Sequence, residues 1–227
     1  MRATPSVESC AVFLRAKSAA PPAADDIALT TSRDGANFTF LGDRQPWLRP
    51  TDDGTVGSRN VWLAAPGPIA VGDEELFFVT RSNFAEGTAF PISEDAKHGW
   101  EGVITLGRMR RHGLVSLDAP YSVAEDAAQL TTKPLTFRGR RLLLNLEASG
   151  GGSVAIEVHS ATAAPGAVVP LLKAMPLVHS GVALEVSWKD PVRHVWNATA
   201  VAALAGRPIV LRMRLQDCKL YSLRFAE

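Results

Sequence analysis

The chain has 227 residues, of which 46% are hydrophobic and 21% are charged, as is typical of a folded globular protein and unlike disordered, collagen-like or coiled-coil chains. Its 24 Lys and Arg residues nearly balance 23 Asp and Glu residues, and no block of five like charges occurs, so we expect no nucleic-acid partner. No apolar run approaches the roughly 20 residues of a membrane-spanning helix, so we expect no membrane partner either.

The residue types that bind metals and cofactors are scattered. Cys10 and Cys218 lie near opposite ends of the chain, with no metal-ligand spacing around either, and we predict two buried free thiols. His159 and His179 lack a partner at ligand spacing, and no Gly-rich phosphate loop opens a helix. The sequence therefore predicts no metal site and no cofactor.

Short runs of β-branched, Leu and aromatic residues, separated by Gly, Pro and Asp-Gly, recur along the chain and predict an all-β protein. Asp34 and Gly35 indicate a sharp turn, because an Asp side chain accepts from nearby backbone N–H groups and Gly adopts positive φ without steric cost. Another turn is expected at 72–74. Before residue 120 the pattern predicts strands at Cys10–Ala16, Asp26–Ser32, Asn37–Leu41, Val61–Val71, Glu75–Arg81, Val103–Arg110 and Val115–Ala119.

Residues 122–128 break the β pattern, so we place a domain boundary between residues 1–120 and 121–227. Alternation of polar and apolar residues in the second part indicates strands with one solvated face, which predicts a β-sandwich. Gly150–Gly152 is expected to be a flexible hairpin connection, and 201–205 a single turn of helix. The strands expected here are Gln129–Phe137, Arg140–Ala148, Ser153–His159, Val182–Trp188, His194–Ala198, Ile209–Gln216 and Lys219–Phe225.

Four stretches, residues 26–38, 106–119, 130–145 and 204–225, together resemble the C-terminal half of glycosyl-hydrolase-like proteins. Those proteins are similar to the five-bladed propeller glycosidases of the invertase and arabinanase type, with a β-sandwich after the last blade. The resemblance implies a partial β-propeller of about one and a half blades, followed by a jelly-roll-like β-sandwich. Residues 1–48 would supply three strands of one blade and 56–120 a four-stranded final blade.

The resemblance also implies what the chain lacks. The family's catalytic carboxylates lie on early and middle blades, which have no counterpart here, so we expect no catalytic residue. The expected function is the C-terminal portion of a glycoside-hydrolase-like, carbohydrate-active protein that is inactive alone. Two alternatives stay open: a non-catalytic glycan-binding module, and a structural piece that self-associates or pairs with another chain through an exposed blade edge.

Sugar recognition needs an aromatic face for the ring and planar donors for its hydroxyls. Two clusters of the first domain combine these residue types, and we predict a carbohydrate-binding site from them: Arg59, Asn60, Trp62, Arg81, His98, Trp100 and Glu101. In the alternative interpretation, both tryptophans of this set pack between blades. In the sandwich, Trp188, His194 and Trp196 are expected to fill the core or pack at its rim.

Overall fold

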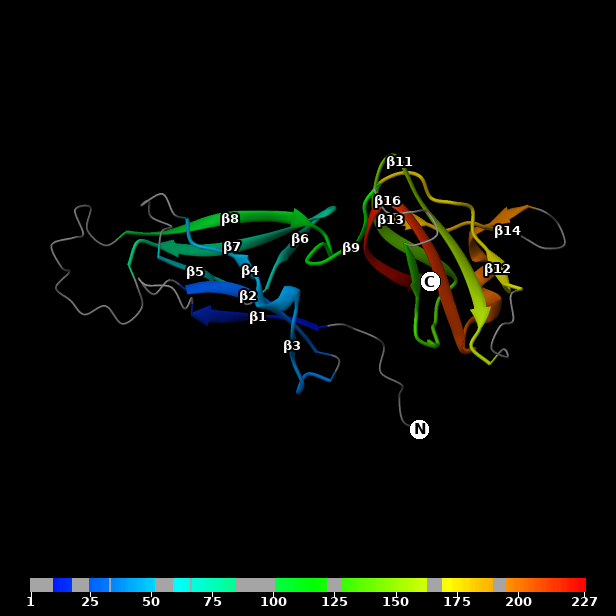
Figure 1. Ribbon diagram of the computed structural model, residues 1–227, viewed down its shortest axis with the longest axis horizontal. Coiled ribbons are helices and arrows are strands. Elements are labelled where there is room, and N and C mark those ends of the chain that lie inside the picture. Colours follow the sequence, from blue (N-terminus) through cyan, green and yellow to red (C-terminus); the bar gives the residue numbers. More distant parts are fainter. Residues whose placement is uncertain are drawn as a thin grey trace. The chain divides into compact units, whose positions relative to one another are not determined.

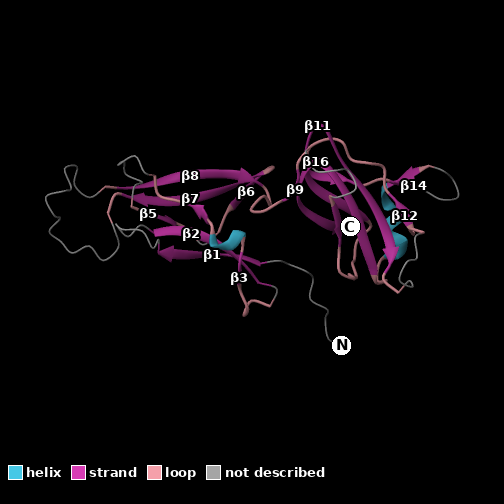
Figure 2. Cartoon of the chain, in the orientation of Figure 1, coloured by secondary structure: helices cyan, strands magenta, loops and turns pink. Residues whose placement is uncertain are grey.

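The computed structural model describes residues 10–17, 25–32, 34–51, 59–65, 67–84, 101–121, 128–162, 169–189 and 195–227. These residues form mostly β-strands, which confirms the all-β prediction (Figure 2). The described helical segments are two short 3-10 helices, η1 (Gly42–Arg44) and η2 (Ala198–Leu204). The chain divides into two compact units, Met1–Met109 and Arg110–Glu227.

The first unit is built on one sheet, in which the strands run in the order β1-β2-β5-β7-β6 (Figure 1). Strands β3 and β4 also pair with β2, and β8 pairs with β7. A single parallel backbone pair, Asp25 with Asn60, joins the group around β2 to the group around β7. The strands are β1 (Cys10–Lys17), β2 (Asp25–Ser32), β3 (Thr39–Phe40), β4 (Pro46–Leu48), β5 (Asn60–Leu63), β6 (Ile69–Val71), β7 (Glu74–Ser82) and β8 (Gly102–Arg110).

Both predicted turns of this unit are present. The Asp34 carboxylate accepts from the backbone N–H groups of Ala36 (2.9 Å) and Asn37 (2.7 Å), and Gly35 has φ +73°. Gly72, with φ +59°, turns the chain from β6 into β7. The expected strand Val61–Val71 is divided instead: β5 ends at Leu63 and β6 begins at Ile69, and the two pair with successive parts of β7.

The second unit is built on a six-stranded sheet ordered β10-β16-β11-β12, in which β13 also pairs with β11 and β9 with β16. A separate pair, β14 with β15, completes its strands. Two of them are unusually long, at 20 and 18 residues. The strands are β9 (Leu117–Ala119), β10 (Gln129–Thr131), β11 (Arg141–Ser160), β12 (Leu172–Lys173), β13 (Gly181–Glu185), β14 (Trp188–Lys189), β15 (Trp196–Asn197) and β16 (Ile209–Ala226).

The long strands β11 and β16 pair with each other on both sides of a corner at residues 149–152, where both bend, so each contributes to two layers (Figure 1). One half of the pair lies between β9 and β13, and the other half between β10 and β12. Gly150–Gly152 is therefore not a hairpin connection: the segments before and after it both pair with β16 rather than with each other. At this corner four residues of β11, 149–152, lie opposite the single residue Asp217, which has φ +42°.

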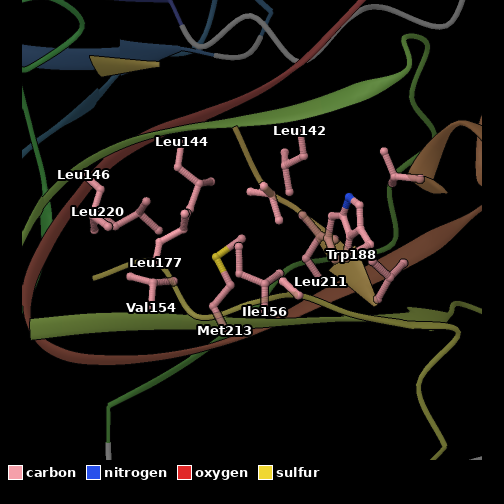
Figure 3. Close-up of a cluster of buried hydrophobic side chains, with 14 of the residues drawn as sticks. Leu142, Leu144, Leu146, Val154, Ile156, Leu177, Trp188, Leu211, Met213 and Leu220 are labelled. Carbon is pink, nitrogen blue, oxygen red and sulfur yellow. The ribbon is translucent and has the colours of Figure 1, made fainter. Parts of the chain in front are cut away.

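The core of the second unit lies between these two layers. Leu142 and Leu144 point from one layer toward Ile156 and Met213 of the other, and Trp188 closes one end (Figure 3). Along β11 the residues that face this core keep even numbers on both sides of the corner, from Leu142 to Leu146 and from Val154 to Val158, as period-2 alternation requires. Along β16 they change from odd, ending at Leu215, to even, from Cys218, because the corner residue Asp217 shifts the register.

The units divide at Met109 and Arg110, earlier in the chain than the break in the sequence pattern at 122–128. Strand β9, which the sequence assigns to the first domain, pairs with β16 of the second unit. Asn145 of β11 holds the segment that precedes β9. Its side-chain NH2 donates to the Arg111 carbonyl (2.6 Å), and its side-chain oxygen accepts from the Arg110 guanidinium. Long-range pairing therefore decides to which unit this segment belongs.

Candidate functional site

Four of the predicted sugar-binding residues come together at one end of the first sheet: Arg59, Asn60, Arg81 and Glu101. Asn60 opens β5 and lies opposite Ser82 at the end of β7, next to Arg81. Glu101 precedes β8, and its backbone N–H donates to the side chain of Asn83 (3.0 Å). The start of β2 joins them, because the Asp25 N–H donates to the Arg59 carbonyl (3.0 Å). The end of this sheet is therefore rich in hydrogen-bonding groups.

Asn60 is the most buried member of this cluster, at 1% exposure. Its amide NH2 donates to the Phe84 carbonyl, which ties β5 to the segment that follows β7. Its side-chain oxygen is buried with no hydrogen-bond partner among the described residues. The contact gives Asn60 a structural role in closing this end of the sheet.

Two carboxyl groups at the start of β2, Asp25 and Asp26, are also buried here. Burial raises the pKa of Asp26; the guanidinium of Arg49 offsets part of this effect, and the Asp25 carboxylate adds to it. Because consecutive residues on a strand point to opposite faces, the two carboxyl groups do not face each other across a common space. Neither residue is among the predicted site residues, although two consecutive acids at the start of an apolar strand are a visible signal in the sequence.

Trp62 and Arg81 lie on opposite faces of the sheet. Trp62 is paired with Thr80 and Arg81 with Val61, and directly opposite residues share a face. Trp62 therefore shares its face with Asn60, while Arg81 lies on the other face and donates to the Arg49 carbonyl (3.5 Å). Trp62 and Arg81 are therefore not placed to contact the same sugar ring. His98 and Trp100 lie outside the described residues.

The face that carries Trp62 continues into a group of exposed apolar side chains on β6, β7 and β8, which we call the outer apolar face. Pairing places Ile69 beside Leu76 on it, and the ion pair between Arg108 and Glu74 (3.4 Å) places alternate β8 residues there as well. Its members, all exposed, are Ile69, Val71, Phe78, Ile104 and Leu106. On β5 and β7 the opposite face is buried: Val61, Phe77 and Val79 lie there, and Trp47 packs edge-on against Phe77.

The sandwich aromatics fall into two groups. Trp188 is fully buried in the core, as expected, whereas Trp196 is 47% exposed at the rim. His194 lies outside the described residues.

A second polar site, with no residue among those predicted to bind sugar, is a groove of about 470 Å³ on the second unit. Its lining comes from β10, β11, β12, β16 and the residues after β12, and its polar members include Glu157, Arg212 and Arg214. Alternation in β11 and β16 predicted a solvated polar face here. This is confirmed for Arg212 and Arg214, which are exposed, whereas His159 on the same side of β11 is buried. The alternation did not reveal that the residues belong to adjacent strands, because strand pairing is not visible in the sequence.

Comparisons of the chain with protein-family models, with curated proteins and with solved structures found no match. Within the described residues, no group of three or more His, Cys, Asp and Glu side chains is placed to hold a metal ion. In the same part of the chain, no helix has the length and apolar character needed to cross a membrane.

Proposed function

We propose that this chain is a non-catalytic portion of a glycoside-hydrolase-like, carbohydrate-active protein, with a partial β-propeller in the first unit and a jelly-roll-like sandwich in the second. The observation that supports this is the outer apolar face. An antiparallel sheet with one solvated face alternates apolar and polar residues. Strand β7 instead carries Phe77 and Val79 on its buried face and Leu76 and Phe78 on the other. Such a sheet is suited to be covered on both sides, as a propeller blade is.

The arrangement of carboxyl groups supports the absence of catalysis. Glycoside hydrolysis uses two carboxyl groups roughly 5 to 10 Å apart on either side of the scissile bond. Asp25 and Asp26 point to opposite faces of β2, and Glu74 forms an ion pair with Arg108 in a surface hairpin. The expected outcome is no turnover of aryl-glycosides, fructan or arabinan by the purified chain. Turnover that disappears in the Asp26→Asn variant would overturn the non-catalytic part of the proposal.

The two neighbouring phenylalanines of β7 test the blade-like sheet directly. Phe77→Ala is expected to lower the free energy of unfolding by about 3–5 kcal/mol, because it removes a buried side chain. Phe78→Ala is expected to cost less than about 1 kcal/mol, since Phe78 is 39% exposed. Urea unfolding of the two variants measures the difference. Equal losses would show that the chain covers its own outer apolar face, and would contradict the blade interpretation.

A second candidate function, glycan binding by the first unit, is favoured by the polar end of the sheet, where Asn60 and Trp62 share one face. In this case Trp62 would stack on a sugar ring. Trp62→Ala would then abolish retention on immobilised glycans in affinity electrophoresis, whereas Trp196→Ala in the second unit would not. If neither variant loses retention on the glycans, or if both lose it, glycan binding at this end of the first sheet is contradicted.

The outer apolar face also supports a structural role, in which the chain associates with a further β-sheet through this face and not through the exposed blade edge that the sequence suggested. Exposed contiguous apolar surface of this kind is uncommon on monomers and marks association sites. Sedimentation of the wild type and of a Phe78→Ser/Ile104→Thr variant tests it. We expect the wild type to self-associate with rising concentration and the variant to remain monomeric; monomeric behaviour of both would contradict it.

A further inference from the structure

The groove on the second unit lies across the middle of one layer of the sandwich. Its floor is formed by β11 and β16, with β10 on one side and β12 on the other. It measures about 470 Å³ and lies wholly within this unit.

Strand pairing arranges the polar lining residues in two rows. In one row, Thr131, Arg212, Glu157 and Lys173 follow one another across four strands as successive cross-strand partners. In the neighbouring row, Gln129, Arg214 and Ala155 do the same. The methyl group of Ala155 is far shorter than the side chains around it, so the second row is hollow at its β11 end.

The groove carries an excess of positive charge. Three cationic side chains, Lys173, Arg212 and Arg214, line it against one carboxylate, that of Glu157. Arg214 and Lys173 remain 59% and 61% exposed, so their charged groups are open to a ligand. Arg212 forms no ion pair within the described part of the chain. Alternation along β16 places the two arginines about 7 Å apart on the same face.

The side chain of Glu157 lies among these cationic side chains, and their contacts favour its ionised form. One of its oxygens lies 3.2 Å from the Lys173 ammonium and 4.0 Å from the Arg214 guanidinium, and the other lies 3.1 Å from His159 Nε2. Burial raises the pKa of Glu157, but its contacts with His159 and Lys173 outweigh burial, and the net shift is downward. The groove therefore presents an anionic acceptor beside its cationic donors at neutral pH.

We propose that this groove binds an acidic oligosaccharide, whose carboxylates lie on Arg212 and Arg214 and whose hydroxyls donate to Glu157 and accept from Gln129. Arginine guanidinium groups bind carboxylates through paired hydrogen bonds, which supplies the charge complementarity. Glu157 suits hydroxyl donors and repels further carboxylates, so it favours a ligand that alternates hydroxyl and acidic groups. The groove is on the second unit, so the proposal goes beyond the function proposed above.

An acidic peptide fits the groove less well. Extended peptides gain affinity by adding a strand to an unpaired sheet edge. The two floor strands β11 and β16 are already paired on both sides, so their backbone groups are not available. Recognition must come from side chains alone, as it does for the hydroxyl and carboxylate groups of a saccharide.

Titration calorimetry of the full chain with tri-galacturonate tests the proposal, with galactotriose as the matched neutral sugar. At an ionic strength of about 50 mM we expect binding of the acidic trisaccharide only, weakening as salt rises toward about 0.5 M. Arg212→Gln/Arg214→Gln should weaken binding at least about tenfold. Arg224→Gln, an exposed arginine elsewhere on β16, is the matched control and should bind like the wild type.

Three results would overturn the proposal: no binding of tri-galacturonate, equal binding of galactotriose, or equal loss in the Arg224→Gln control. Tighter binding of a penta-glutamate peptide would assign the groove to acidic peptides instead. Lys173→Gln provides a second variant if the double variant does not fold, and should also weaken binding. The effect of Trp62→Ala separates this site from the first unit: binding of tri-galacturonate should persist in that variant.

Discussion

The backbone carbonyl oxygen of Asp217 occupies the space that a β-carbon on residue 152 would need, so the corner of the second unit accepts only glycine at Gly152. The hydroxyl of Ser149 donates to the same carbonyl (3.1 Å), which holds β11 against β16 at this point. Both long strands change layer here. The close approach of Gly152 to Asp217 is thus part of what allows two strands to serve both layers of the sandwich.

Gly152→Ala is expected to lower the free energy of unfolding by about 2–4 kcal/mol, because the added methyl group must displace the backbone of β16. Gly150→Ala is the matched control: nothing lies within 4 Å of its β-carbon position, and its effect should stay within about 0.5 kcal/mol. Urea unfolding measures both. Similar values for the two variants would mean that the corner is not constrained by Asp217.

Trp188→Phe is expected to cost less than about 2 kcal/mol of stability, against about 3–5 kcal/mol for Trp188→Ala. Trp188 is fully buried, and its indole N–H has no hydrogen-bond partner in the described part of the chain. Removing a buried unpaired donor recovers about 1–3 kcal/mol, which offsets part of the lost packing. Thermal unfolding of the two variants checks this, and equal costs would indicate that the N–H is satisfied in solution.

Asp34 makes the stability of the first unit depend on pH in the acid range. Hydrogen bonds from the backbone N–H of Asn37, its side chain, the Ala36 N–H and the Ser32 hydroxyl lower the pKa of Asp34. A carboxyl whose pKa is lower in the folded state stabilises that state above its unfolded pKa, and the contribution disappears as the pH falls through the folded value. Asp34→Asn should therefore flatten the loss of stability below about pH 4. Urea unfolding at a series of pH values tests this. If the free energy of unfolding of the variant falls with decreasing pH as steeply as that of the wild type, the prediction is contradicted.

The Cys218 thiol is expected to react slowly with disulfide reagents in the folded protein. Cys218 is free and buried, and burial raises the pKa of its thiol, so little thiolate forms near neutral pH. In a Cys10→Ser variant, labelling by a colorimetric disulfide reagent at pH 8 should be slow in buffer and rapid in urea. Fast labelling in buffer would show that the strand around Cys218 opens readily.

Several features follow from local sequence alone. The alternation in Ser153–His159 and Ile209–Leu215 indicated strands with one polar face, and Asp34 with Gly35 indicated a turn, because both signals depend on neighbouring residues. The all-β class follows from the same signals repeated along the chain. The buried state of Cys218 and the core position of Trp188 were expected from their residue types and are confirmed.

Other features depend on which strands pair, and that is decided only when the chain folds. Local pattern made Gly150–Gly152 look like a hairpin, whereas β16, more than fifty residues later, pairs with both flanking segments. The opposite faces of Trp62 and Arg81, and the meeting of Glu157 with Arg214, are likewise set by register between distant strands. Alternation tells which residues of a strand share a face, but only pairing tells which residues of another strand lie beside them.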